Sequence, residues 1–363
     1  MFINPEKILN ILQNEPKISD LVNLLNSEGD LQKTLFQTAA EIKTKYVGNF
    51  VYLRALIEYS NICRKNCYYC GIRKDNKNLV RYIMTDEEVI NAAKYAYKEK
   101  YASLALQAGE LNSENFTKKI SNLLQKINSE TNNEMGITLS LGEQSENVLK
   151  EWKEIGIRRY LLRIETSNQD LYKKIHPNDE THNYQNRLNT LLILRKLNYQ
   201  VGSGIMIGLP FQTIENLAED ILFFKKLDID MIGMGPYIEH SDTPLFKFHK
   251  QLLPLQKRFE LTLKMIAIMR IMMKNINLVA STAMQAIDKI GREKALMAGA
   301  NVIMPNLTPI KYRENYLLYQ NKPFLNEDAE LSKNNIENCI RFAGDEIAYG
   351  QWGDSKHYFE RQI

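Results

Sequence analysis

The chain of 363 residues has few cysteines, five histidines and no long apolar run. Four cysteines are too few for a disulfide scaffold, so we expect a reducing compartment, the cytoplasm. No stretch of about 18 uncharged apolar residues offers a membrane span, and the start MFINPEKILNIL lacks the pattern of a signal peptide. A balance of 47 basic against 43 acidic residues does not indicate nucleic-acid binding. The composition is that of a soluble enzyme.

Short apolar segments alternate with helical patterns through most of the chain. After the first of these segments, Thr85 and Glu88 have the spacing of a capping box, which predicts that a helix begins there. Eight such units predict the α/β class and a (β/α)8 TIM barrel, with a doubly wound open sheet as the alternative. The expected strands are 51–59, 103–110, 136–143, 158–166, 201–210, 230–238, 277–282 and 300–306.

The expected barrel occupies residues 49–320 and is flanked by helical segments. Residues 1–48 have apolar positions at helical spacing and form an N-terminal helical cap. Residues 321–363 form a C-terminal helical tail that packs on the barrel. Because chemistry in such barrels is found where strands end and loops begin, we expect the polar residues after each strand to gather at one mouth.

Three of the four cysteines, Cys63, Cys67 and Cys70, lie within eight positions directly after the first expected strand. A structural zinc site usually takes four protein ligands, and the fourth cysteine, Cys339, falls in an expected C-terminal helix. A cubane [4Fe–4S] cluster normally takes four thiolates, so three leave one iron open to a small molecule with an amine and a carboxylate. A zinc loop, a plain electron-transfer cluster and a chance grouping are the alternatives.

The spacing Cys-x3-Cys-x-aromatic-Cys, with Tyr69 before the last cysteine, resembles the signature of radical S-adenosylmethionine (SAM) enzymes. The resemblance implies that the three cysteines hold one [4Fe–4S] cluster and that SAM, bound at its open iron, is cleaved reductively to a 5′-deoxyadenosyl radical. Longer stretches, among them LQAGE, RYLLRIETSN, GLPFQT and GANVIMPNLTP, are similar to the HydE-type [FeFe]-hydrogenase maturases. Methylornithine synthase and biotin synthase are near relatives of that group.

The resemblance also implies which residues surround the cofactor and the substrate. Glu165 and Arg187 match positions that hold SAM, since a carboxylate suits an amino group or hydroxyls and a guanidinium suits a carboxylate; for each, a surface ion pair is the alternative. Arg159 and Arg163 are four apart on a strand and therefore share a face, where buried cations need an anion or acidic partners. Cofactor-binding candidates are Tyr69, Gln107, Gly109, Glu110, Ser140, Glu165 and Arg187; substrate-binding candidates are Thr138, Arg159, Arg163, Ser281, Thr282, Met304 and Tyr316.

For function, the resemblance implies action on an iron–cysteine carbonyl–cyanide precursor, or a related small sulfur or amino-acid substrate, in [FeFe]-hydrogenase cofactor assembly. A different substrate, as in methylornithine synthase or biotin synthase, and a non-enzymatic iron–sulfur carrier are the alternatives. The implied partners are the substrate, a reducing electron donor of the flavodoxin or ferredoxin type, and other hydrogenase maturases. Neither nucleic acid nor a membrane is expected, and an exposed iron implies oxygen sensitivity.

Three positions depart from the family pattern. Ile164 stands where a histidine is common, and strand alternation predicts that it points away from the barrel interior. Phe211 replaces the glycine of GLPGQT, which predicts a reshaped loop. Of the C-terminal cysteine group that many such maturases carry, only Cys339 is present, so we predict a single cluster.

Overall fold

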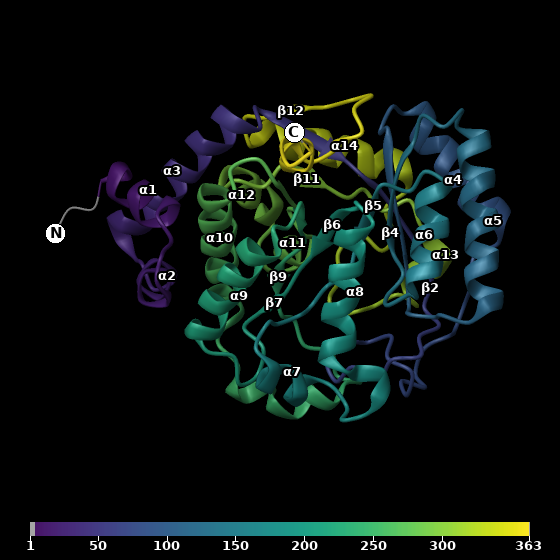
Figure 1. The fold of residues 1–363 in the computed structure, drawn as a ribbon, viewed down its shortest axis with the longest axis horizontal. Helices are drawn as coiled ribbons and strands as arrows, with labels where there is room; N and C mark the ends of the chain where they lie inside the picture. The colour runs from purple at the N-terminus through teal and green to yellow at the C-terminus, as the bar shows by residue number, and fades with distance from the viewer. Residues whose placement is uncertain (1–3, 363) are drawn as a thin grey trace.

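Parallel strands form the centre of the molecule, and helices cover their outer side (Figure 1). The computed structural model describes residues 4–362. Seven strands make one sheet in the order β10-β8-β6-β5-β4-β3-β2, with every neighbouring pair parallel. Their bounds are β2 Ala55–Ser60, β3 Ser103–Ala108, β4 Gly136–Ser140, β5 Arg159–Leu161, β6 Gln200–Ser203, β8 Met231–Ile232 and β10 Asn277–Leu278.

The two edges of this sheet are joined through β11 (Val302–Ile303), which pairs in parallel with β1 (Phe50–Leu53). On one side, Leu56 N donates to Pro305 O at 2.6 Å, and on the other, Ala280 N donates to Val302 O at 2.9 Å. The ring is therefore closed, and the predicted barrel is confirmed. The doubly wound sheet, which needs two open edges, is not observed. A small parallel pair, β7 (Met206–Ile207) with β9 (Gly235–Pro236), extends the wall beyond β6 and β8.

Helices follow the strands in the predicted order. The expected cap of α4 (Asp86–Lys98) is present: Thr85 Oγ1 accepts from Glu88 N, and Thr85 N donates to Glu88 Oε2 at 2.9 Å. In α6 (Glu146–Glu154), Trp152 is fully buried, as expected for a helix that turns its apolar face toward the sheet. The other barrel helices are α5 Glu114–Glu130, α8 Tyr184–Lys196, α9 Ile214–Leu227, α10 Leu255–Met272, α12 Gly291–Met297 and α13 Ile310–Arg313.

Three short helices lie in the loops after strands and were not anticipated from periodicity. They are α7 (Gln169–Ile175), the 3₁₀ helix η2 (Pro244–Gln251) and α11 (Thr282–Ile287), with a further 3₁₀ turn, η1, at Glu180–His182. Each follows a β segment on the side where the cysteines lie. None of the described helices is both long enough and apolar enough to cross a membrane.

The N-terminal helices α1 (Pro5–Gln13), α2 (Ile18–Leu25) and α3 (Gly29–Tyr46) stack beside α9 and α10 (Figure 1). At the other end of the chain come α14 (Ala329–Phe342), β12 (Glu346–Ile347) and α15 (Lys356–Glu360). Strand β12 pairs in parallel with β1, which carries the following residues to the amino ends of the barrel strands.

The segment from Trp352 to Ser355 fills that amino end. Arg54 donates to Gly353 O at 2.9 Å, and Arg159 donates to Trp352 O at 2.8 Å and to Asp354 Oδ1 at 2.6 Å. Both arginines are almost completely buried, so the C-terminal segment supplies the acceptors that their charges require.

Candidate active site at the mouth of the barrel

The cysteine loop leaves the carboxyl end of β2 and runs to the start of α4. Cys63, Cys67 and Cys70 are free and half-buried, and Cys63 Sγ accepts a hydrogen bond from Glu110 N at 3.3 Å. Gly109 allows this approach, because a Cβ there would lie 2.4 Å from Ile62 O and 2.9 Å from Cys63 Cβ. The loop after β3 is thus packed directly against the first cysteine.

Burial raises the pKa of all three thiols: that of Cys67 rises to about 12, and that of Cys70 rises well above its usual value. Thiolates here need a positive charge beside them, which bound iron supplies. Residues 4–362 contain no group of three or more His, Cys, Asp or Glu side chains suited to hold a single metal ion such as zinc. Three thiols in one loop do fit the donor set of a cluster with one open iron.

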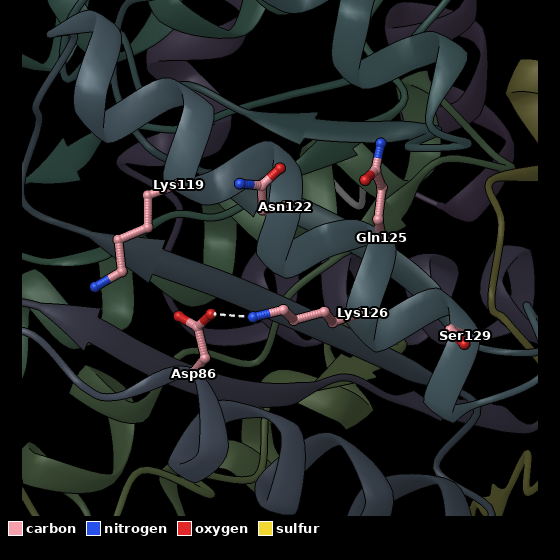
Figure 2. A pocket seen from close by; sticks show the side chains of 6 residues that line it. All are labelled: Asp86, Lys119, Asn122, Gln125, Lys126 and Ser129. Carbon is pink, nitrogen blue, oxygen red and sulfur yellow. Dashed lines mark hydrogen bonds and ion pairs between the residues drawn. The ribbon is translucent and has the colours of Figure 1, made fainter.

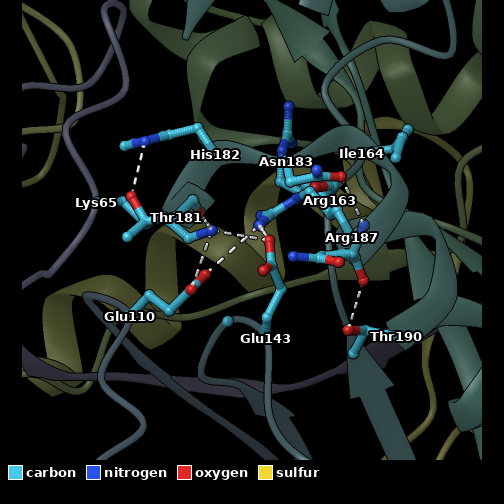
Figure 3. A network of polar contacts seen from close by, with 12 residues as sticks. Lys65, Glu110, Glu143, Arg163, Ile164, Thr181, His182, Asn183, Arg187 and Thr190 are labelled. Atoms are coloured by element: carbon cyan, nitrogen blue, oxygen red, sulfur yellow. Dashed lines mark hydrogen bonds and ion pairs between the residues drawn. The ribbon is translucent and has the colours of Figure 1, made fainter. Parts of the chain in front are cut away.

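Beside this loop lies a network of buried charges (Figure 3). Glu110 forms ion pairs with Arg64 at 3.0 Å, Lys65 at 3.3 Å and Arg187 at 3.5 Å. Glu143, after β4, pairs with Lys65 at 2.9 Å and with Arg187 at 2.8 Å. Two carboxylates and three cations from four separate segments therefore meet beside the cysteines.

The network keeps its groups charged. Burial alone would lower the pKa of Arg187, but the carboxylates of Glu110 and Glu143 raise it well above its usual value. Burial alone would raise the pKa of Glu143, but Arg187 and Lys65 outweigh it and the pKa is lowered. A fixed cation such as Arg187, preorganised by carboxylates, is suited to the carboxylate of an amino-acid ligand.

A second ion pair follows β5. Arg163 and Glu165 form two parallel bonds of 2.9 Å, and Glu165 has a φ of +67°, a conformation that is costly for a residue with a Cβ. Arg163 also donates to Gly233 O at 2.6 Å, while Arg187 Nε donates to Arg163 O at 2.6 Å. Between the pair, Ile164 is fully buried in the main hydrophobic core, as strand alternation predicted.

Tyr69 lies against His176, which in turn lies beside His182. Its hydroxyl is 3.2 Å from His176 Nε2, and the His176 ring stacks on Tyr172 with centroids 3.9 Å apart. His182 Nε2 accepts from Asn66 N at 2.8 Å. These contacts fix the backbone of the cysteine loop from its outer side.

On the inner side, Gln107 at the end of β3 donates to the hydroxyl of Tyr316 at 3.2 Å, and its strand neighbour is Ser140. The ammonium of Lys322 donates to Tyr316 O at 3.1 Å and to the carboxylate of Glu58, on β2. The segment after α13 is therefore tied to the barrel wall across the mouth.

The remaining predicted site residues are divided between the two ends of the barrel. Arg159 and Thr138, which are bonded to each other at 3.0 Å, lie with the C-terminal segment and not with the cysteine loop. Ser281, Thr282 and Met304 follow β10 and β11 at the mouth. The Ser281 hydroxyl is buried and has no partner among the described residues.

Sequence reasoning missed Lys65, Glu143, Glu58 and Lys322. Lys65 lies between two of the cysteines and Glu143 directly after a predicted strand, so position alone pointed to both. Cys339 is buried in α14, and its surroundings are Arg292, Glu293 and Asp345. It is not part of the cysteine loop.

A hollow elsewhere on the surface is unrelated to this mouth. It is lined by residues of α5 and the first residue of α4, where Lys126 pairs with Asp86 at 2.8 Å (Figure 2). It lies over the outer helices, and no thiol lines it.

Comparison with known proteins agrees with the barrel and the cysteine loop. The Radical SAM superfamily matches residues 57–224, so fold and site together define a radical SAM enzyme, of the kind that uses a [4Fe–4S] cluster and SAM. The chain is 44% identical over 338 residues to the [FeFe] hydrogenase maturase subunit HydE of Thermotoga maritima, covering 93% of this chain and 92% of that protein. It belongs to the HydE family.

More distant relatives share the fold. A 3-methylornithine synthase of Methanosarcina acetivorans is 27% identical over 297 residues, 80% of each chain. The crystal structure of methylornithine synthase (PylB) matches with a TM-score of 0.79 at 23% identity, over 99% of both chains. Because the chain belongs to an enzyme family, the alternative of a non-enzymatic iron–sulfur carrier is set aside.

Proposed function

We propose that this protein is a maturase for [FeFe]-hydrogenase that uses SAM to act on an iron–cysteine carbonyl–cyanide precursor. The observation that carries the proposal is the three-thiol loop at the barrel mouth beside a buried cation network, in a chain 44% identical to HydE of Thermotoga maritima. Its setting is proposed to be the anaerobic cytoplasm, and the other hydrogenase maturases are its proposed partners.

In this proposal Cys63, Cys67 and Cys70 hold the cluster. When bound, the cluster and SAM supply one-electron cleavage of a carbon–sulfur bond. Arg187, Glu165 and the residues of the β3 and β4 loops orient the cofactor; Tyr69 and Gly109 support the loop itself. The proposed cofactor residues of those two loops are Gln107, Glu110 and Ser140.

The substrate is proposed to lie deeper, against the inner wall. Arg163, Ser281, Thr282, Met304 and Tyr316 surround that space, and the unpartnered Ser281 hydroxyl supports the presence of a polar ligand. Arg159 and Thr138 close its floor through their contacts with the C-terminal segment.

The test is anaerobic reconstitution with iron and sulfide, followed by reduction with dithionite in the presence of SAM. We expect 5′-deoxyadenosine together with loss of the iron–cysteine carbonyl–cyanide precursor, and no such loss with a Cys67→Ser variant. If 5′-deoxyadenosine forms only with an amino acid such as lysine, the methylornithine type of reaction replaces the proposed one.

A further inference from the structure

Phe211 has an unusual backbone conformation and an exposed ring. Its φ is +69°, in the left-handed region that bulky residues rarely adopt. The backbone at this position suits glycine, yet the residue carries an aromatic ring that is 44% exposed. Strained residues of this kind cluster at binding and catalytic sites.

The ring does not stand alone. It makes an edge-to-face contact with Phe248 of η2, with centroids 4.7 Å apart, and Lys174 Nζ of α7 lies 5.5 Å from its centre. Lys247 Nζ is 4.9 Å from the centre of the Phe248 ring. The result is an exposed Phe211 ring against a half-buried Phe248 ring, bordered by two exposed lysines.

Helices α7 and η2, which carry Lys174 and Phe248, are both hydrogen-bonded to the cysteine loop. Tyr68, between the second and third cysteines, donates its N–H to Ile175 O at the end of α7 at 3.0 Å. Its own carbonyl accepts from Leu245 N of η2 at 3.1 Å. Tyr68 and Phe248 also pack on the same small hydrophobic cluster, which includes Leu171 and Leu245. The aromatic pair therefore lies on the outer side of the cysteine loop.

The same three segments concentrate positive charge. Residues 61–83, 169–175 and 244–251 carry ten basic and two acidic residues, whereas the whole chain has 47 basic against 43 acidic. The rest of the chain is therefore acidic overall. Lys65 is buried and paired with Glu110 and Glu143, the three arginines are half-buried, and the other six lysines are exposed to solvent.

We infer that this surface, formed by Phe211, Phe248, Lys174, Lys247 and the outer side of the cysteine loop, docks a small acidic one-electron carrier protein of the flavodoxin or ferredoxin type. The inference rests on the proposed function. An apolar aromatic centre with a charged rim is the common anatomy of a protein interface, and the charge selects an acidic partner. A second copy of this chain would bring like charges together across a symmetric contact. In each encounter the carrier loses one electron and the cluster gains it.

The test compares two reductants on the cluster-loaded enzyme with SAM. Phe211→Gly preserves the backbone conformation and removes the ring, and Lys174→Glu with Lys247→Glu reverses the rim charge. We expect 5′-deoxyadenosine formation driven by reduced flavodoxin to fall about tenfold in each variant, with a raised KM for flavodoxin in the charge reversal. Formation driven by dithionite, which needs no docking, should be unchanged.

Lys118→Glu with Lys150→Glu, on exposed positions of α5 and α6, is the matched control and should leave both rates unchanged. Flavodoxin-driven rates that are equal in wild type and both surface variants, or lowered equally by the control, would overturn the inference. If the enzyme forms no 5′-deoxyadenosine even with dithionite, the proposed function fails. The docking inference is then tested separately, by calorimetric titration of the enzyme with oxidised flavodoxin. Loss of binding in both variants supports the surface, and unchanged binding refutes it.

Discussion

Replacing Lys322 by methionine should destabilise the protein far more than an ordinary lysine substitution. The Lys322 side chain is 9% exposed and that of its partner Glu58 is 2% exposed. Without the ammonium, the Glu58 carboxylate keeps one side-chain donor, Asn306 Nδ2 at 3.2 Å. Removing one partner of a buried ion pair costs about 3–5 kcal/mol, because the remaining charge is buried without compensation.

A matched surface pair provides the control. Lys311 of α13 pairs with Glu88 of α4, and the Lys311 side chain is 64% exposed. Exposed pairs contribute about 0–1 kcal/mol, so Lys311→Met should have a small effect. The double variant Glu58→Gln with Lys322→Met removes both charges and should recover most of the loss.

The measurement is the free energy of unfolding from urea titration of the cluster-loaded protein under anaerobic conditions, followed by far-ultraviolet circular dichroism. If Lys322→Met lowers the free energy of unfolding no more than Lys311→Met does, the buried ion pair between Lys322 and Glu58 does not stabilise the protein as argued. If the double variant is as unstable as Lys322→Met, the loss comes from packing and not from the unpaired charge.

Three further predictions concern single residues. Cys67→Ser should abolish the absorbance of the cluster and 5′-deoxyadenosine formation while leaving circular dichroism unchanged; normal cofactor cleavage would contradict the assignment. Gly109→Ala brings a Cβ to 2.4 Å from Ile62 O, so it should lower bound iron and sulfide per chain and cost about 1–3 kcal/mol of stability; full iron content would show that the loop adapts. Burial raises the pKa of Asp220 from 3.8 to about 7, so the folded state binds more protons than the unfolded state in that range and stability should fall as pH rises through it. Asp220→Asn should flatten this slope in urea titrations at several pH values, and an equal slope in both proteins would refute the assignment.

The strand order and the position of the cysteine loop could be predicted because both depend on local patterns. Apolar segments and capping residues such as Thr85 and Glu88 determine where strands and helices begin. The ends of parallel strands in a barrel must then share one mouth. The short helices α7, η2 and α11 escaped prediction because they have seven, eight and six residues, too few to show a clear periodicity.

Arg159 and Arg163 show the limit of such reasoning. Alternation correctly gives them one face, but four residues along a strand span roughly 13 Å, which separates the two ends of the barrel. Arg159 finds its acid in Asp354, far along the chain, and Arg163 finds Glu165 two residues away. No local sequence pattern predicts that Asp354 is the partner of Arg159.

The two ends of the barrel consequently have different chemistry. At the amino end, the C-terminal segment occupies the donors of Arg54 and Arg159, so that end is filled by the chain itself. At the carboxyl end, the Ser281 hydroxyl lacks a partner and Gln107 is only half-buried, so polar groups remain free to meet a ligand. We therefore expect a small molecule to bind at the carboxyl end, which the segment anchored by Lys322 borders. Loosening that segment should admit water to a site whose radical chemistry depends on excluding it.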